Sequence, residues 1–296
     1  MEEFKRVFGI KFIMVFTVTM LLNIGLFVYS SSEGKSMSDI RQETHYRQWI
    51  IGELSDMQPE EALEIANIQS DSVIKRKYDE LEPEEQTVYS RQLNKIKEQL
   101  EYIVKYPEDI KNIQNNADTL KSFSIFADKK SFTYNNIQKT AKDFKRVEGV
   151  QVYLTDNKAV DSFVTYYYIY YLSLILNVFV LYELFGEREN GMWCIVHTSK
   201  SGRAKLAFNR TMIITASAFI ITGVLFFTTF LTSFILYKTA SINAPIQNIE
   251  SFSRFSLPMS QLEYIIYDFL YSFCAVLTLT AIVWMAFVFI RHRNIA

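Results

Sequence analysis

The chain of 296 residues carries 31 basic and 32 acidic side chains, and its formal net charge of -1 gives no general attraction to nucleic acid. Charged residues make up 21% of the sequence, as in an ordinary soluble protein, but they are concentrated between four apolar windows. The two cysteines exclude a disulfide-rich scaffold, and the three histidines lie on separate segments with no second ligand at metal spacing.

The first apolar window, residues 10–29, follows a leader that contains Lys5, Arg6 and Lys11. A secretory signal would share this arrangement, but the apolar stretch is longer than a usual signal core and its exit lacks a small-x-small cleavage pattern. We therefore expect residues 1–29 to form an amphipathic lead-in and a retained transmembrane helix.

The polar block that follows, residues 30–162, is predicted to be an extracytoplasmic helical domain. Before Pro107, apolar residues recur at helical spacing along one face, and the segment after Pro107 repeats this spacing as a second helix. The first stripe consists of Tyr89, Leu93, Ile96, Leu100 and Ile103. Two earlier windows, residues 46–54 and 60–74, have helical patterns as well. Such stripes are most simply the core of a small helical domain, and a groove for a peptide or lipid is the alternative.

Near the end of this block, the alternation from Val150 to Leu154 predicts one short strand.

Three further apolar windows predict transmembrane helices at residues 163–185, 212–237 and 263–290, because a span takes roughly 20 apolar residues. Tyrosines crowd the starts of the first and last of these windows, as in an interfacial aromatic belt.

Lysine and arginine are frequent in the leader, in the connector 186–211 and in the tail 291–296, and sparse in the loop 238–262. The positive-inside rule therefore places both termini and the connector in the cytoplasm, and the loop and the domain outside.

Four polar residues lie in or near the predicted spans: Asn23, Asn177, Glu183 and Asp268. Ionisable and amide side chains in a bilayer are frequently functional, so these are candidate intramembrane sites. A hydrogen bond to a neighbouring helix is the simpler role for the two asparagines.

The connector is dense in charge, with Gly-Glu-Arg-Glu-Asn-Gly-Met-Trp at 186–193 and Thr-Ser-Lys-Ser-Gly-Arg at 198–203. The sequence contains no phosphate-cradling Gly-x4-Gly-Lys-Ser/Thr loop and no catalytic constellation, so neither an enzyme nor a bound cofactor is expected. The Ser-Lys-Ser stretch at 199–201 is more typical of a solvated basic loop than of a nucleophile beside a base.

These connector motifs, after one span, a large outside domain and a second span, resemble a permease subunit of the bacterial type-2 exporter-like ATP-binding-cassette (ABC) transporters. The resemblance implies that the connector docks into a separate cytoplasmic ATPase subunit, and that a second permease chain completes the pathway. It implies a coupling role for nine residues: Glu187, Arg188, Glu189, Gly191, Met192, Trp193, Ser199, Gly202 and Arg203.

Motifs at 123–126, 131–137 and 139–144 are similar to a pattern in permeases of Gram-positive bacteria. Permeases of this class usually have six helices per half, whereas this sequence has four apolar windows. A short variant completed by another subunit and a truncated or split reading frame are both compatible with that difference.

The sequence thus predicts a mostly α-helical polytopic protein of a bacterial cell membrane, with four transmembrane helices and a helical domain inserted between the first and second. The expected function is export of a peptide, antibiotic or lipid-like cargo, with ATP hydrolysed on the partner chain. The alternative is a membrane-anchored sensor or a secretion or assembly accessory protein that binds through its outer domain.

Overall fold

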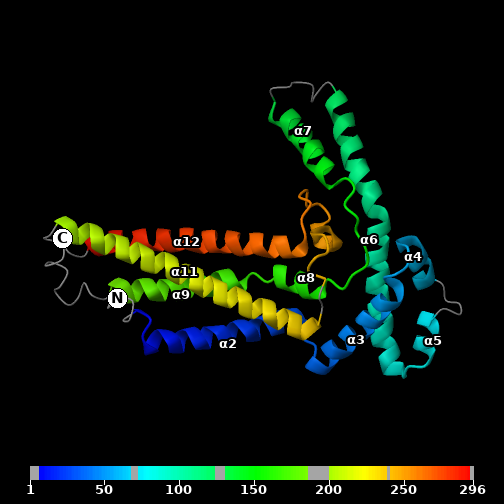
Figure 1. The fold of residues 1–296 in the computed structure, drawn as a ribbon, viewed down its shortest axis with the longest axis horizontal. Coiled ribbons are helices and arrows are strands. Elements are labelled where there is room, and N and C mark those ends of the chain that lie inside the picture. The colour runs from blue at the N-terminus through cyan, green and yellow to red at the C-terminus, as the bar shows by residue number, and fades with distance from the viewer. Residues whose placement is uncertain (1–6, 68–72, 124–130, 186–199, 239–240, 294–296) are drawn as a thin grey trace. The chain divides into compact units, whose positions relative to one another are not determined.

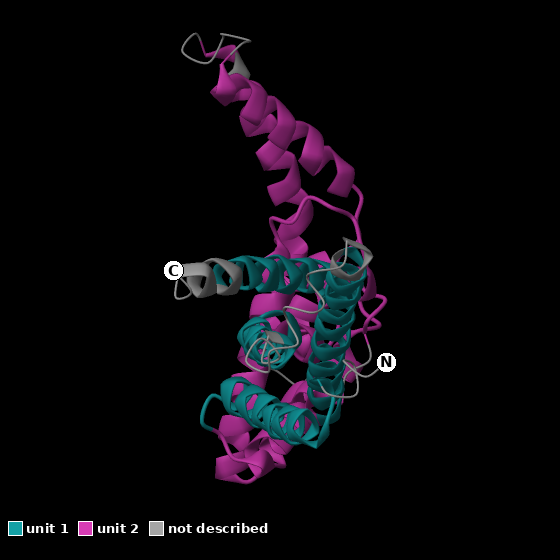
Figure 2. Ribbon diagram, turned by 90° about the vertical axis from the view of Figure 1, so that its left-hand side faces the viewer, with its two compact units in different colours: residues 1–34, 162–235, 265–296 teal, residues 35–161, 236–264 magenta. Residues whose placement is uncertain are grey.

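A computed structural model describes residues 7–67, 73–123, 131–185, 200–238 and 241–293. These residues are mostly helical, and among them the only β-type pairing is an isolated antiparallel bridge between Pro245 and Ser260. The chain divides into two compact units (Figure 2). Unit 1 comprises Met1–Gly34, Ser162–Ile235 and Ile265–Ala296, and unit 2 comprises Lys35–Asp161 and Leu236–Tyr264.

Unit 1 is built from long apolar helices that run side by side (Figure 1). They are α2 (Ile10–Ser32), α9 (Tyr168–Phe185), α11 (Lys200–Tyr237) and α12 (Gln261–Arg293). Aromatic rings fill the contact between the last two, where Phe219 packs edge-on against Phe269 and Phe273.

Within the described residues, three helical segments are long and apolar enough to cross a membrane: Ile10–Ser32, Ala204–Tyr237 and Gln261–Ala286. Only 17% of the most apolar window is buried in the first and in the third, so most of their apolar side chains face outward, where lipid tails would cover them. The prediction of a mostly helical chain with membrane-length apolar helices is confirmed.

The predicted span at 163–185 is interrupted. Helix α8 (Lys158–Val164) and α9 meet at 45° across a short break, and they make a further candidate span only if the bent pair is taken as one. The β-branched Thr165 lies in the break, and Tyr166 N–H bonds the carbonyl of Phe163 three residues back, as in a tightened helix end.

Helix α11 begins at Lys200, whereas the sequence placed the start of this span at Met212. The apolar window marks only the part suited to lipid. The preceding stretch is rich in lysine, arginine, alanine and leucine, which are good helix formers, so the helix continues beyond the apolar part.

The main body of unit 2 is organised around one long helix, α6 (Pro83–Ser122), which contacts every other α-helix of that body (Figure 1). These are α3 (Met37–Leu54), α4 (Pro59–Asn67), α5 (Val73–Asp79) and α7 (Phe132–Phe144). The stripe predicted on α6 forms much of the core, together with the apolar face of α3: Tyr46, Ile50, Leu54, Tyr89, Ile96, Leu100 and Ile103 are all buried.

The prediction of a separate helix after Pro107 was wrong, because α6 continues through this residue. A proline inside a helix lacks one N–H donor and costs about 3 kcal/mol. Pro107 itself is exposed, and the buried Ile103, Tyr106 and Ile110 anchor the helix on both sides of it. Packing of these side chains offsets the lost hydrogen bond.

The segment Leu236–Tyr264 belongs to unit 2, although the sequence treated it as a separate loop. Asn248 holds it to the segment before α8: its Nδ2 donates to the carbonyl of Tyr153 (2.8 Å) and to Oγ1 of Thr155 (3.1 Å). The Asn157 Nδ2 donates to the Asn248 carbonyl (3.0 Å), and the Gln261 Nε2 donates to Asn157 Oδ1 (2.7 Å).

A further bond joins this segment to α6, because the Tyr102 hydroxyl donates to the Gln247 carbonyl at 2.7 Å. Asn157, Gln247, Asn248 and Gln261 are all buried. A buried amide that loses its partners costs about 1–3 kcal/mol, so this network fixes the path of the segment.

The strand predicted at Val150 to Leu154 was wrong as an assignment, since no strand partner lies beside it among the described residues. The segment from Val150 to Asn157 instead runs without helix, turn or bend.

We predict that Asn248→Ala loosens residues 242–262, because it removes the side chain that bonds both Tyr153 and Thr155. The expected loss of about 2 kcal/mol corresponds to roughly 30-fold faster amide hydrogen exchange in that segment. Asn94→Ala, at an exposed position on α6, is the matched control and should leave this exchange unchanged. Equal exchange in the two variants would contradict the assignment.

Candidate functional site

Most of the residues predicted to couple to an ATPase lie outside the described residues: Glu187, Arg188, Glu189, Gly191, Met192, Trp193 and Ser199. Gly202 and Arg203 lie in the first turn of α11, where the backbone is helical. Their coupling role stays a prediction.

Asn23 lies fully buried on α2 and joins three parts of unit 1. Its Nδ2 donates to Oγ1 of Thr229 (2.8 Å) and to the carbonyl of Leu225 (3.3 Å), both on α11. The Tyr166 hydroxyl, from the break between α8 and α9, donates to Asn23 Oδ1 (3.0 Å) and to its carbonyl (3.1 Å). Every polar atom of this side chain is therefore satisfied inside the apolar bundle.

Asn177 is likewise buried, and joins α9 to α11. It donates to the carbonyl of Ser173 (2.8 Å) and accepts from the Ser217 hydroxyl (3.3 Å). Asp268 of α12 accepts from the Tyr170 hydroxyl of α9 (3.3 Å). These three residues act as hydrogen-bonded ties between helices.

Glu183 is half-buried in the last turn of α9. The structure does not bring it together with Asn23, Asn177 and Asp268 as one cluster; each of the three has its own set of partners.

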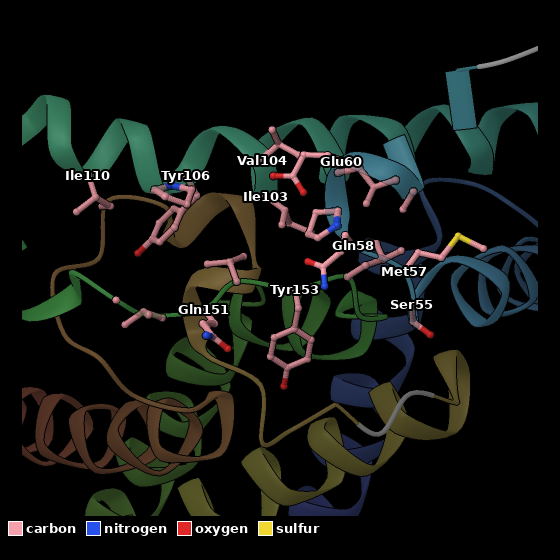
Figure 3. Close-up of a pocket in the computed structure, with 18 of the residues that line it drawn as sticks. Ser55, Met57, Gln58, Glu60, Ile103, Val104, Tyr106, Ile110, Gln151 and Tyr153 are labelled. Atoms are coloured by element: carbon pink, nitrogen blue, oxygen red, sulfur yellow. The ribbon is translucent and has the colours of Figure 1, made fainter. Parts of the chain in front are cut away.

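Unit 2 contains a cavity of about 770 Å³, which is within the range of roughly 300–1,000 Å³ of small-molecule sites (Figure 3). It lies between the α3–α4 corner, the middle of α6 and the residues after α7. Its apolar lining includes Leu54, Leu100, Ile103, Val104, Ile110, Val147, Val150, Val152 and Leu154. Two exposed carboxylates and one exposed ammonium group lie at its edge: Glu60, Glu148 and Lys111.

Tyr106 is the polar group set deepest in this lining. Its side chain projects from α6 at the cavity (Figure 3), only 2% of the residue is exposed, and its hydroxyl has no hydrogen-bond partner within the described part of the chain. Burial raises the pKa of Tyr106 to about 12, so the hydroxyl is neutral at physiological pH and can both donate and accept. An unpaired buried hydroxyl is the kind of group that a ligand satisfies.

The mostly apolar lining with a few polar groups is typical of a small-molecule or peptide site. Over the ranges that the structure describes, no group of three or more His, Cys, Asp or Glu side chains could hold a metal ion. The sequence left a groove in this domain open as an alternative but did not locate it, because the walls come from three separated segments. The helical stripe with Leu100 and Ile103 and the alternation at 150–154 each marked part of the lining.

Comparisons with known proteins give no further assignment: no protein-family model, curated protein or solved structure matches this chain significantly.

We predict that Asn23→Leu, which keeps the number and branching of the side-chain heavy atoms but removes the hydrogen bonds to Thr229 and Tyr166, destabilises unit 1. Such inter-helix bonds average about 0.6 kcal/mol and reach about 1.7 kcal/mol, so the heat-unfolding midpoint of the full chain in detergent should fall by about 2–4 °C. Thr17→Val is the control, because Thr17 is exposed on α2 and bonds the carbonyl of Ile13 on its own helix. A midpoint no lower than that of the control would contradict the tie.

The stability of the chain at high pH should depend on the buried Tyr106 hydroxyl. The pKa of Tyr106 is about 12 in the folded chain, above the ordinary value of 10.0, so an unfolded chain releases this proton first as pH rises. The contribution of Tyr106 to stability is present below about pH 10 and is lost towards pH 12. Tyr106→Phe should therefore lose less of its unfolding midpoint between pH 9 and pH 11 than the wild type. Identical losses would show that the hydroxyl titrates at its ordinary pKa.

Proposed function

We propose that this chain is the membrane-spanning permease subunit of a bacterial type-2 exporter-like ABC transporter. In this proposal four spans cross the cell membrane, both termini are cytoplasmic, and the connector 186–211 docks into a separate ATPase subunit. A second permease chain completes the pathway, and the cargo is a peptide, an antibiotic or a lipid-like molecule. The connector motifs support the choice of family. The presence in unit 2 of chain from both sides of residues 162–235 supports the topology.

The observation that carries the topology is that unit 2 contains chain from both sides of residues 162–235. A compact unit held by buried amide bonds lies on one side of a bilayer, so Asp161 and Leu236 lie on the same side. The apolar part of α11 accounts for one crossing between them. In the proposed topology the chain crosses once more near residues 162–185, and the bent pair α8–α9 supports this because it is long and apolar enough if the pair is taken as one span.

The number of membrane crossings also decides on which side the two ends of the chain lie in this proposal. Helix α2 leads into unit 2 and α12 leads out of it. If each crosses the membrane once, as we propose, both termini and the connector are on the side opposite to unit 2. This is the orientation that the positive-inside rule gives for the lysines and arginines of the leader, connector and tail.

The length of α11 and the contacts of its last residue support coupling through this helix. This helix runs without interruption for 38 residues from the end of the connector, a length of about 57 Å at 1.5 Å per residue. Its last residue, Tyr237, is held within unit 2: the Gln48 Nε2 donates to the carbonyls of Tyr237 (3.2 Å) and Lys238 (2.9 Å), and the Arg47 guanidinium lies 5.8 Å from the Tyr237 ring centre. Movement of the connector would therefore reach unit 2 along one rigid element.

The cavity of unit 2 favours a second candidate, a membrane-anchored sensor or assembly accessory that binds a ligand without driving transport. The two candidates differ in whether an ATPase subunit accompanies the chain, so co-purification from native membranes separates them.

We predict that Glu187→Lys with Glu189→Lys abolishes recovery of an ATPase subunit with the tagged chain, because it reverses the charge offered to the docking cleft. Membrane insertion should be unchanged. Glu98→Lys with Glu108→Lys, at exposed positions on α6, is the matched control and should retain the ATPase. Full recovery with the connector variant would refute docking through these residues, and absence of an ATPase from the wild type would favour the accessory function.

A further inference from the structure

The segment from Val150 to Leu154 has the character of a β-strand without a sheet. It has no helix, turn or bend, and its burial alternates: Val150 and Val152 are half-buried and Leu154 is buried, whereas Gln151 and Tyr153 are exposed. Residues of one parity pack on the core of unit 2, as the side chains on one face of a strand do.

One edge of this segment is already paired, by a side chain. The Tyr153 N–H donates to Asn248 Oδ1 (3.4 Å), and the Asn248 Nδ2 donates back to the Tyr153 carbonyl (2.8 Å). Asn248 thus occupies the place of one residue of a neighbouring strand.

The other edge is open. Successive residues of a strand direct their backbone N–H and C=O groups to opposite edges, so those of Val152 and Leu154 point away from Asn248. Within the described part of the chain, no hydrogen bond reaches the backbone groups of either residue. Both residues line the 770 Å³ cavity, together with Ser55, Gln58 and the unpaired hydroxyl-bearing Tyr106.

We propose that this cavity binds a peptide in extended conformation, which pairs as a strand with residues 150–154. A stretch of about five peptide residues matches the length of this segment at roughly 3.3 Å per residue. Peptide N–H and C=O groups repeat at the spacing of the open edge, and side chains of one parity would enter the apolar lining. Glu60, Glu148 and Lys111 at the edge offer partners for charges of both signs.

A lipid tail fits these groups less well. It would cover the apolar lining but leave the backbone groups of Val152 and Leu154 desolvated and unpaired, at a cost of about 1–3 kcal/mol for each group. The site rests on unit 2 alone and does not depend on docking of an ATPase.

The test uses the full chain in nanodiscs and a capped hexapeptide library of random sequence. Retained peptides are identified by mass spectrometry, and the most enriched one is synthesised with a fluorophore for affinity measurement. Two further versions carry N-methyl groups on alternate amides, one in each register. Because strand pairing uses only one set of amides, one register should lose at least about tenfold in affinity and the other should bind as the parent does.

Val104→Trp should abolish binding by placing an indole ring in the cavity where the peptide would lie, whereas Lys105→Trp, on the adjacent residue outside the lining, should not. Circular dichroism checks that both variants fold. The N-methyl comparison needs no variant, so it decides the question even if Val104→Trp misfolds. The proposal is overturned if no hexapeptide is enriched over empty nanodiscs, if both registers bind alike, or if palmitate displaces the peptide from the unaltered chain at lower concentration than unlabelled peptide does.

Discussion

The buried amide network around Asn248 is the constraint on which the arrangement of this chain depends. Asn248 bonds Tyr153 and Thr155, and Asn157 and Gln261 extend the network along the segment that leads into α12. The Asn248 and Asn157 side chains each both donate and accept, so one side chain can hold two stretches of the chain in fixed register. These bonds attach residues 236–264 to the rest of unit 2, so the segment is part of the compact unit rather than a separate loop.

The middle of α11 and its last residue are held by different chemistry. Within unit 1, Asn23 and Asn177 bond α11 in surroundings where water cannot compete for their hydrogen bonds. Within unit 2, the final residue is held by Gln48 through its carbonyl and by Arg47 over its ring. A shift of α11 along its axis would have to change both sets of bonds.

Hydropathy and periodicity predicted much of this fold. Apolar windows located the long helices, and the stripe of α6 predicted the core of unit 2, because both patterns reflect burial directly. Three features of the fold were not predicted from the sequence. Packing on both sides carried α6 through Pro107, and good helix formers extended α11 beyond its lipid-suited part. The partners of Asn248 lie about ninety residues away in sequence, and no local pattern reports such a bond. The polar residues Asn23, Asn177 and Asp268 were noticed, but their partners required the structure.

An open strand edge is ordinarily a liability, because another sheet can add to it and start aggregation. In this chain the open edge consists of the backbone groups of Val152 and Leu154, since the Val150 N–H already donates to the Val147 carbonyl. It lies in a cavity between α6 and the α3–α4 corner rather than on a flat surface. The charged Glu148 and the left-handed Gly149 (φ +89°) precede it, and Asn248 covers the opposite edge. A broad sheet cannot enter such a site, whereas a single extended chain can. The geometry therefore protects the edge from other sheets while leaving it open to a peptide, and this selectivity is what separates a binding site from a folding defect.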